Sequence, residues 1–176
     1  MRARAVRVCV LLTTLASLAA RPVAAASLKD ELLRDWADMK QSMLKLADEM
    51  PDDKYSFKAT PPERTYGEQV LHVATANIIN LAYLHPKTPA PAIDRRATTK
   101  AEAMKAMAAS FDYGTAVINE QTDATLLEVV DAGRFLGQST KARVVWFLLG
   151  HSWDIYGQMA VYLRLSGGVP PASQRP

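Results

Sequence analysis

The sequence contains a single cysteine among 176 residues, Cys9, and this residue lies in a leader-like segment at the start. Once that segment is removed, the chain can form no disulfide, has no cysteine nucleophile and offers no thiolate to a metal. It also lacks a glycine-rich phosphate loop and a Gly-x-Ser-x-Gly sequence, which argues against the P-loop and serine-hydrolase classes. Beyond the leader-like segment, no apolar run approaches the roughly 20 residues that a membrane-spanning helix needs.

Residues 1–26 have the three parts of a secretory signal peptide. Three arginines come first, an apolar run follows at 8–20, and small residues suited to signal peptidase stand at 23–26. An uncleaved membrane anchor is the alternative, but the apolar run is short for a bilayer span. We therefore expect cleavage and export to the periplasm or the cell exterior, which leaves residues 27–176 as one domain.

Positive charge is concentrated in the same leader. It holds four of the 21 Lys and Arg residues and none of the 18 Asp and Glu residues, so the remaining chain has 17 basic and 18 acidic residues and a net charge of −1. A nearly neutral domain has no electrostatic reason to bind nucleic acid. It also lacks the basic amphipathic face that would hold it to a membrane surface.

Four stretches carry apolar residues at gaps of three and four, which is the spacing of one helix face. They cover residues 28–50, 66–84, 100–120 and 139–165. Two of the starts have the hydroxyl residue and the glutamate of a capping box, at 65–68 and 99–102. The connection at 122–138 holds an apolar piece that fits a short extended or helical segment. Since no series of strands is present, the pattern predicts an all-α four-helix bundle.

Chemistry is confined to few residues, and the three histidines are the main candidates. His85 stands at a helix end before a proline and is interpreted as a partner of the helix C-terminal dipole or as a surface residue. His72 and His151 lie in the middle of different predicted helices, on faces that point inward, so they can converge in the bundle core, where metal sites form from facing helices. A third ligand would be a carboxylate, from Glu68 one turn before His72 or from Asp154 three residues after His151.

A simpler alternative also fits these positions. Both imidazoles can be core groups that hydrogen-bond to Glu68, to Gln158 or to a tyrosine hydroxyl. Trp146 and Trp153 flank the second histidine, and we interpret them as packing or dimer-contact residues rather than as part of a ligand site.

Two sequence segments resemble the DinB superfamily. The first is Pro-Pro-Glu-Arg-Thr-Tyr-Gly-Glu-Gln-Val-Leu-His-Val-Ala at 61–74, which contains Gly-Glu-x-x-x-His-x-Ala. The second, His-Ser-Trp-Asp-Ile-Tyr-Gly-Gln at 151–158, continues to Val-Tyr-Leu-Arg at 161–164. Order and spacing both match, and the resemblance extends over nearly the whole chain after the leader. The ending at 167–173 is similar to that of secreted members.

The resemblance implies an up-down-down-up four-helix bundle, often dimeric, with a divalent metal such as zinc or nickel on three histidines. One of these stands on the second helix and two stand on the fourth, in a His-x-x-x-His-x-Gly-Gln pattern. Carried to this sequence, the ligands are His72 and His151, but the third position is Ile155, which cannot bind a metal. Characterised relatives include thiol-dependent S-transferases and a mycothiol-dependent isomerase.

Two functions follow as hypotheses. In the first, the chain is an exported bundle with a degenerate or altered metal site and no robust catalysis, which binds a small molecule in its core or forms a homodimer. In the second, it is a metal-dependent transferase or hydrolase in which Asp154 or Glu68 completes the metal shell with His72 and His151.

Overall fold

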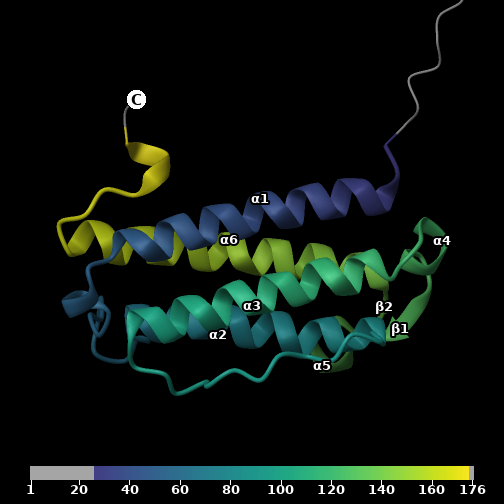
Figure 1. Ribbon diagram of the computed structural model, residues 1–176, viewed down its shortest axis with the longest axis horizontal. Coiled ribbons are helices and arrows are strands. Elements are labelled where there is room, and N and C mark those ends of the chain that lie inside the picture. Colours follow the sequence, from purple (N-terminus) through teal and green to yellow (C-terminus); the bar gives the residue numbers. More distant parts are fainter. Residues whose placement is uncertain (1–25, 175–176) are drawn as a thin grey trace, which may run out of the picture.

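The computed structural model describes residues 26–174, and these are mostly helical. Four long helices run along the molecule: α1 (Leu28–Glu49), α2 (Tyr66–Leu81), α3 (Lys100–Asn119) and α6 (Lys141–Leu165) (Figure 1). They correspond to the four stretches that the apolar spacing predicted. The predicted signal peptide and Cys9 lie outside the described residues.

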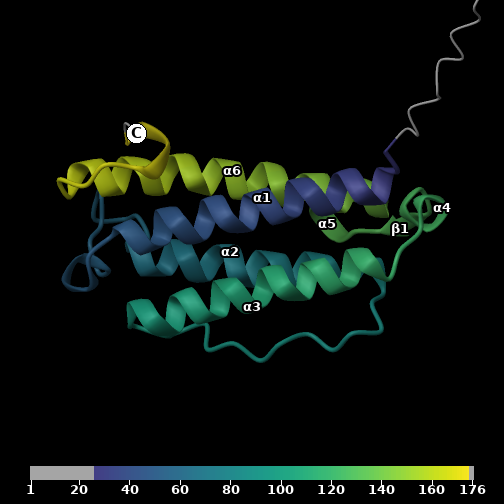
Figure 2. The same ribbon diagram turned by 45° about the horizontal axis from the view of Figure 1, so that its top comes forward.

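Each long helix packs against two others. Helices α1 and α2 both contact α3 on one side and α6 on the other (Figure 2). The buried face of α1 shows why this packing forms, since its apolar residues recur at gaps of three and four. These residues are Leu32, Trp36, Met39, Met43, Leu46 and Ala47. Burial of such stripes is the main driving force for assembly, at roughly 25 cal/mol per Å² of apolar surface.

A glycine in α3 allows a close approach to α1. Gly114 faces the indole of Trp36, and a Cβ built on Gly114 would lie 2.2 Å from the Trp36 Cζ2 atom. The same indole donates a 2.8 Å hydrogen bond from Nε1 to the Phe111 carbonyl oxygen of α3. Its buried polar group is therefore satisfied, and α1 and α3 are fixed in register.

Side-chain caps define where the long helices begin. Thr65 and Glu68 form the complete capping box at the start of α2, as predicted. At the start of α3 the prediction is only half right. The Thr99 hydroxyl accepts from the Glu102 backbone N–H, but the Glu102 carboxylate accepts from the Thr99 hydroxyl rather than from its backbone. Ser27 caps α1 and Thr140 caps α6 in the same way, through their hydroxyl oxygens.

The connections carry short elements that periodicity does not reveal. They are the 3-10 helices Asp52–Lys54, Ala82–Leu84 and Pro171–Ser173, the helices α4 (Asp123–Leu126) and α5 (Gly133–Leu136), and the strands β1 (Val129–Asp131) and β2 (Gln138–Thr140). The two strands pair antiparallel, with Val130 opposite Ser139. The second helix was predicted to extend to residue 84, but its α-helical part ends at Leu81. The last turn is the 3-10 helix Ala82–Leu84, which leads into His85 at φ 53°.

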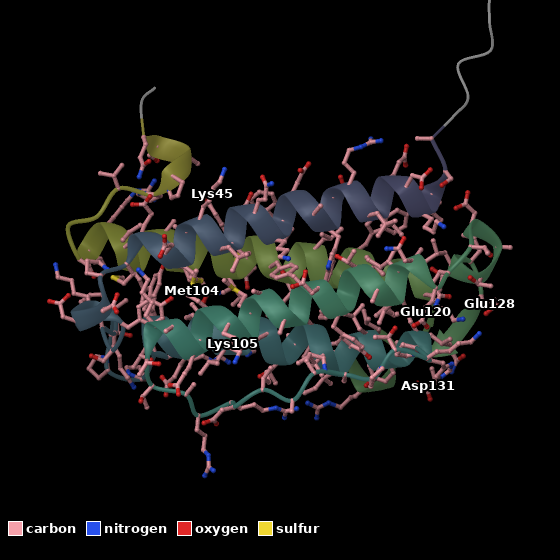
Figure 3. All side chains as sticks on the ribbon, in the orientation of Figure 1. Lys45, Met104, Lys105, Glu120, Glu128 and Asp131 are labelled. Carbon is pink, nitrogen blue, oxygen red and sulfur yellow. The ribbon has the colours of Figure 1, made fainter. Side chains whose placement is uncertain are left out.

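Charged side chains cover the outside of the bundle, as Lys45, Lys105 and Glu120 show in Figure 3. Glu120, just after α3, also holds the proline-rich connection that follows α2, because its carboxylate accepts hydrogen bonds from the backbone N–H groups of Lys87 and Thr88 at 2.7 and 2.8 Å. Among the described helices, none has the length and apolar character to cross a membrane.

Candidate functional site

His72 and His151 come together in the structure. His72 lies in the middle of α2 and His151 in the middle of α6. Their ring centroids are 4.9 Å apart and the ring planes meet at 81°, so that the edge of one imidazole faces the plane of the other. The helical spacing therefore identified the two histidines that meet between these helices.

The second imidazole is held by packing and not by hydrogen bonds. Phe147, one helical turn earlier, stacks on His151 with ring planes 7° apart and centroids 6.2 Å apart. The Nε2 atom of His151 is buried and has no hydrogen-bond partner among the described residues. Gln158, which the sequence offered as a partner, instead accepts from the Gln69 side chain at 2.9 Å and donates to Asp154 at 3.1 Å. The interpretation of His151 as a hydrogen-bonded core group is therefore wrong for this atom.

Both imidazoles are held in their neutral form. Burial lowers the pKa of His72 to about 4, and the positive charges of Arg64 and of a protonated His151 act in the same direction. Burial also lowers the pKa of His151; the charge of Asp154 opposes this effect and that of Arg64 adds to it. Neutral rings can offer a lone pair to a ligand or a metal, and they can donate through the other nitrogen.

The position expected for a third ligand is apolar. Ile155 stands one turn after His151 on α6 and is 2% exposed, within the core. The two carboxylates proposed as substitutes are engaged elsewhere. Asp154 is exposed and accepts from Gln158, and Glu68 accepts from the Thr65 backbone N–H at 2.6 Å in the capping box.

The donor set is thus incomplete for the three-histidine metal site that the resemblance implies. Between residues 26 and 174, no three His, Cys, Asp or Glu side chains are gathered closely enough to hold a metal ion. Two imidazoles alone fall short of the three protein ligands that a catalytic zinc ordinarily has. The side chains as they stand do not fit a three-ligand centre.

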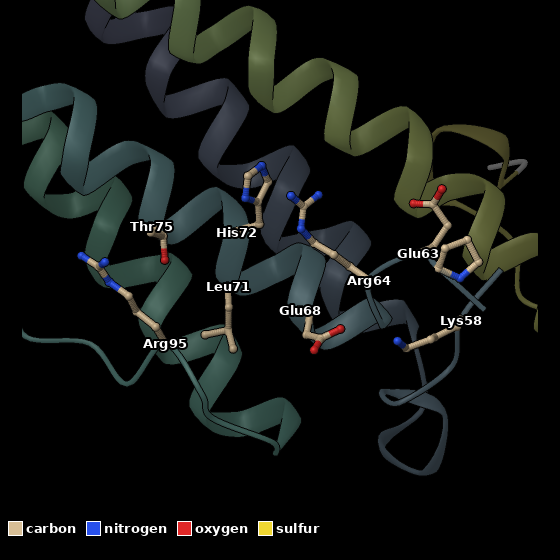
Figure 4. A pocket seen from close by; sticks show the side chains of 9 residues that line it. Lys58, Glu63, Arg64, Glu68, Leu71, His72, Thr75 and Arg95 are labelled. Carbon is tan, nitrogen blue, oxygen red and sulfur yellow. The ribbon is translucent and has the colours of Figure 1, made fainter. Parts of the chain in front are cut away.

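A cavity of about 460 Å³ opens beside His72 (Figure 4). Its wall carries three cationic side chains, Lys58, Arg64 and Arg95, which Figure 4 shows around His72 and Glu68. Sequence reasoning missed these three residues, because Lys58 and Arg95 belong to connections where no helical period places a side chain. The only available signal was Arg64, which directly precedes the capping Thr65.

The remaining candidates lie away from this cavity. His85 is exposed at the end of its 3-10 helix, as expected for a surface residue. Trp146 and Trp153 are 53% and 55% exposed on the outer face of α6, so they do not act as core packing residues. A face with two exposed indoles on one helix is compatible with a contact between molecules.

Comparison with known proteins agrees with the sequence motifs. The family model of the DinB superfamily matches residues 35–159, which confirms the resemblance. A DinB-like protein from Bacillus cereus has a similar fold, with a TM-score of 0.67 and 23% identity over 80% of this chain and 93% of its own. A DinB-like protein from Bacillus subtilis gives a TM-score of 0.63 and 17% identity over 83% and 99%. No curated protein matches the chain.

Proposed function

The chain belongs to the DinB superfamily, and we propose that it is an exported member in which the family's metal site has become a small-molecule binding site without robust catalysis. The observation that carries this proposal is the side-chain set in the bundle. His72 and His151 pack edge to face, and Ile155 occupies the position of the expected third ligand.

The electrostatics support the same conclusion. The guanidinium of Arg64 is close enough to both imidazoles to disfavour a positive charge on either ring. The same repulsion opposes a divalent cation placed between them. The charge of the exposed Asp154 opposes this effect at His151, while the Glu68 carboxylate is engaged in the cap of α2.

Metal analysis tests this proposal. The purified protein is loaded with zinc or with nickel, passed through a desalting column and measured by elemental analysis beside His72→Ala. We expect well under one equivalent of metal in both proteins and no change of melting temperature with a chelator. One equivalent of metal in the wild type that is lost in His72→Ala would overturn the proposal.

A metal-dependent transferase or hydrolase is the second candidate. The observation in its favour is that the charge of Asp154 already acts on His151. In this candidate the Asp154 side chain leaves Gln158 and turns toward the imidazoles, and the metal set is His72, His151 and Asp154. Asp154→Asn separates the two candidates, because it abolishes metal uptake in the second and has no effect in the first.

We also propose a homodimer that forms through the exposed face of α6. Trp146, Trp153 and Val161 lie exposed along this helix. Gly150 and Gly157 leave room for a close approach, since a Cβ added to either would meet no atom within 4 Å. Sedimentation at micromolar concentration should give a dimer for the wild type and a monomer for Trp146→Ser/Trp153→Ser. A monomeric wild type would contradict the proposal.

Export and topology complete the proposed function. The signal-like composition of residues 1–26 supports cleavage near residue 26, and we propose up-down-down-up connectivity for the four long helices. Mass spectrometry of the protein recovered from a bacterial periplasm should give the mass of a chain that starts close to residue 27. Recovery of the uncut chain in the membrane fraction would support the anchor instead.

A further inference from the structure

We propose that the cavity beside His72 binds a small anion that carries carboxylate or phosphate groups. This inference rests on the proposed function, because it treats the site as a ligand site and not as a metal centre. It starts from the volume of about 460 Å³, which falls in the ordinary range for small-molecule pockets.

The charged groups of the wall carry the argument. Lys58, Arg64 and Arg95 contribute three positive charges, and Glu63 and Glu68 contribute two negative charges. The four ion pairs found among residues 26–174 involve other side chains, so none of these three cations is neutralised by a carboxylate within 4 Å. A guanidinium without a partner is a strong donor to carboxylate and phosphate oxygens.

Glu68 keeps its negative charge, so that with Glu63 the wall has a net charge of +1, but its carboxylate is engaged in the cap of α2. Its Oε2 atom accepts from the Thr65 backbone N–H at 2.6 Å, which also lowers the pKa of this carboxyl. It is therefore oriented by the cap of α2 and acts on Lys58 and Arg64 only from a distance. Arg95 comes from the connection before α3, so cations from separate segments border one cavity (Figure 4).

Neutral donors complete the wall. His72 borders the cavity with an uncharged ring, and the Thr75 hydroxyl lies one turn further along α2. Figure 4 shows the Arg64 guanidinium beside the His72 ring, while Arg95 lies near Thr75. The arrangement offers two groups of donors, one at each end of the wall. An anion with two acidic groups, or a phosphate ester, can contact both.

The test is a titration of the metal-stripped protein at constant ionic strength, monitored by two-dimensional NMR. Inorganic phosphate and succinate are the probes, with chloride as the balancing anion, and the two arms separate phosphate from dicarboxylate recognition. Phosphate or succinate should shift the signals of His72 and its neighbours in the wild type. Arg64→Gln and Arg95→Gln should each weaken binding by about tenfold.

Arg96→Gln is the matched control, because it removes the same charge from the adjacent position, which does not border this cavity. It should bind within about twofold of the wild type, since screening leaves only a weak long-range effect. Three results would each overturn the inference. The wild type could bind neither probe, Arg64→Gln and Arg95→Gln could bind the probes as tightly as the wild type does, or Arg96→Gln could lose as much affinity as the two site variants. Because metal has been removed from the protein, a bound metal cannot bridge to the anion in this assay. A failure to bind the probes would therefore refute the anion site alone, and the elemental analysis would still decide whether the metal site has been lost.

Discussion

His72 should remain uncharged far below the pH at which an ordinary histidine titrates. Its pKa is lowered from 6.5 to about 4 by burial between α2 and α6, with help from Arg64 and His151. This difference in pKa corresponds to about 3.4 kcal/mol in the free energy of unfolding if all of it acted on folding. Because the ring borders an open cavity, water screens part of this effect, and about 1 kcal/mol is the expected contribution between pH 7.5 and pH 5.

The direction of the pH dependence of stability follows from whether the folded or the unfolded chain binds the proton more easily. The unfolded chain takes up a proton on His72 at about pH 6.5, whereas the folded chain does so only near pH 4. Stability from this group is therefore fully present above pH 6.5, and it is lost as the pH falls from 6.5 toward 4.

Two measurements check this prediction. The ring proton signals of His72, followed by NMR in the folded protein, should shift with a midpoint near pH 4. Urea unfolding of His72→Gln should lose about 1 kcal/mol less between pH 7.5 and pH 5 than the wild type does. A midpoint close to 6.5, or the same pH dependence in His72→Gln, would refute the assignment of a buried neutral ring.

Three substitutions test other parts of the structure. Ile155→His adds a third imidazole one turn after the second and should strengthen zinc binding by about 100-fold or more, as measured by calorimetry; no gain in a folded variant would refute the assigned ligand register of α6. Gly114→Ala places a methyl group against Trp36 and should cost about 3 kcal/mol in urea unfolding, and an unchanged free energy of unfolding would contradict the close packing of α1 on α3. Thr65→Ala removes the capping box of α2 and should cost about 1 kcal/mol, and a neutral change would show that the cap is dispensable.

The long helices could be predicted because local signals agree with the tertiary structure. Apolar residues at gaps of three and four mark the buried face of α1, and Thr65 with Glu68 marks the start of α2. The segment 122–138 could not be assigned in the same way. Its helices and strands are three or four residues long, and pieces of that length are stabilised by what they contact and not by their own period.

The candidate site was predictable only in part. Helical spacing placed His72 and His151 on inward faces, and the family pattern identified Ile155 at the third position. Neither could show that the rings meet edge to face, because side-chain rotamers depend on the packed neighbours. The cations of the cavity were missed because Lys58 and Arg95 lie in connections whose path is set by tertiary contacts.

A zinc titration followed through the NMR signals of the two core histidines tests the central claim most directly. If His72 and His151 form a neutral pair without a third ligand, up to two equivalents of zinc should leave both sets of ring signals unshifted. A new set of signals for both rings that is complete at one equivalent would contradict the account, because it would mean that the pair is a working metal centre.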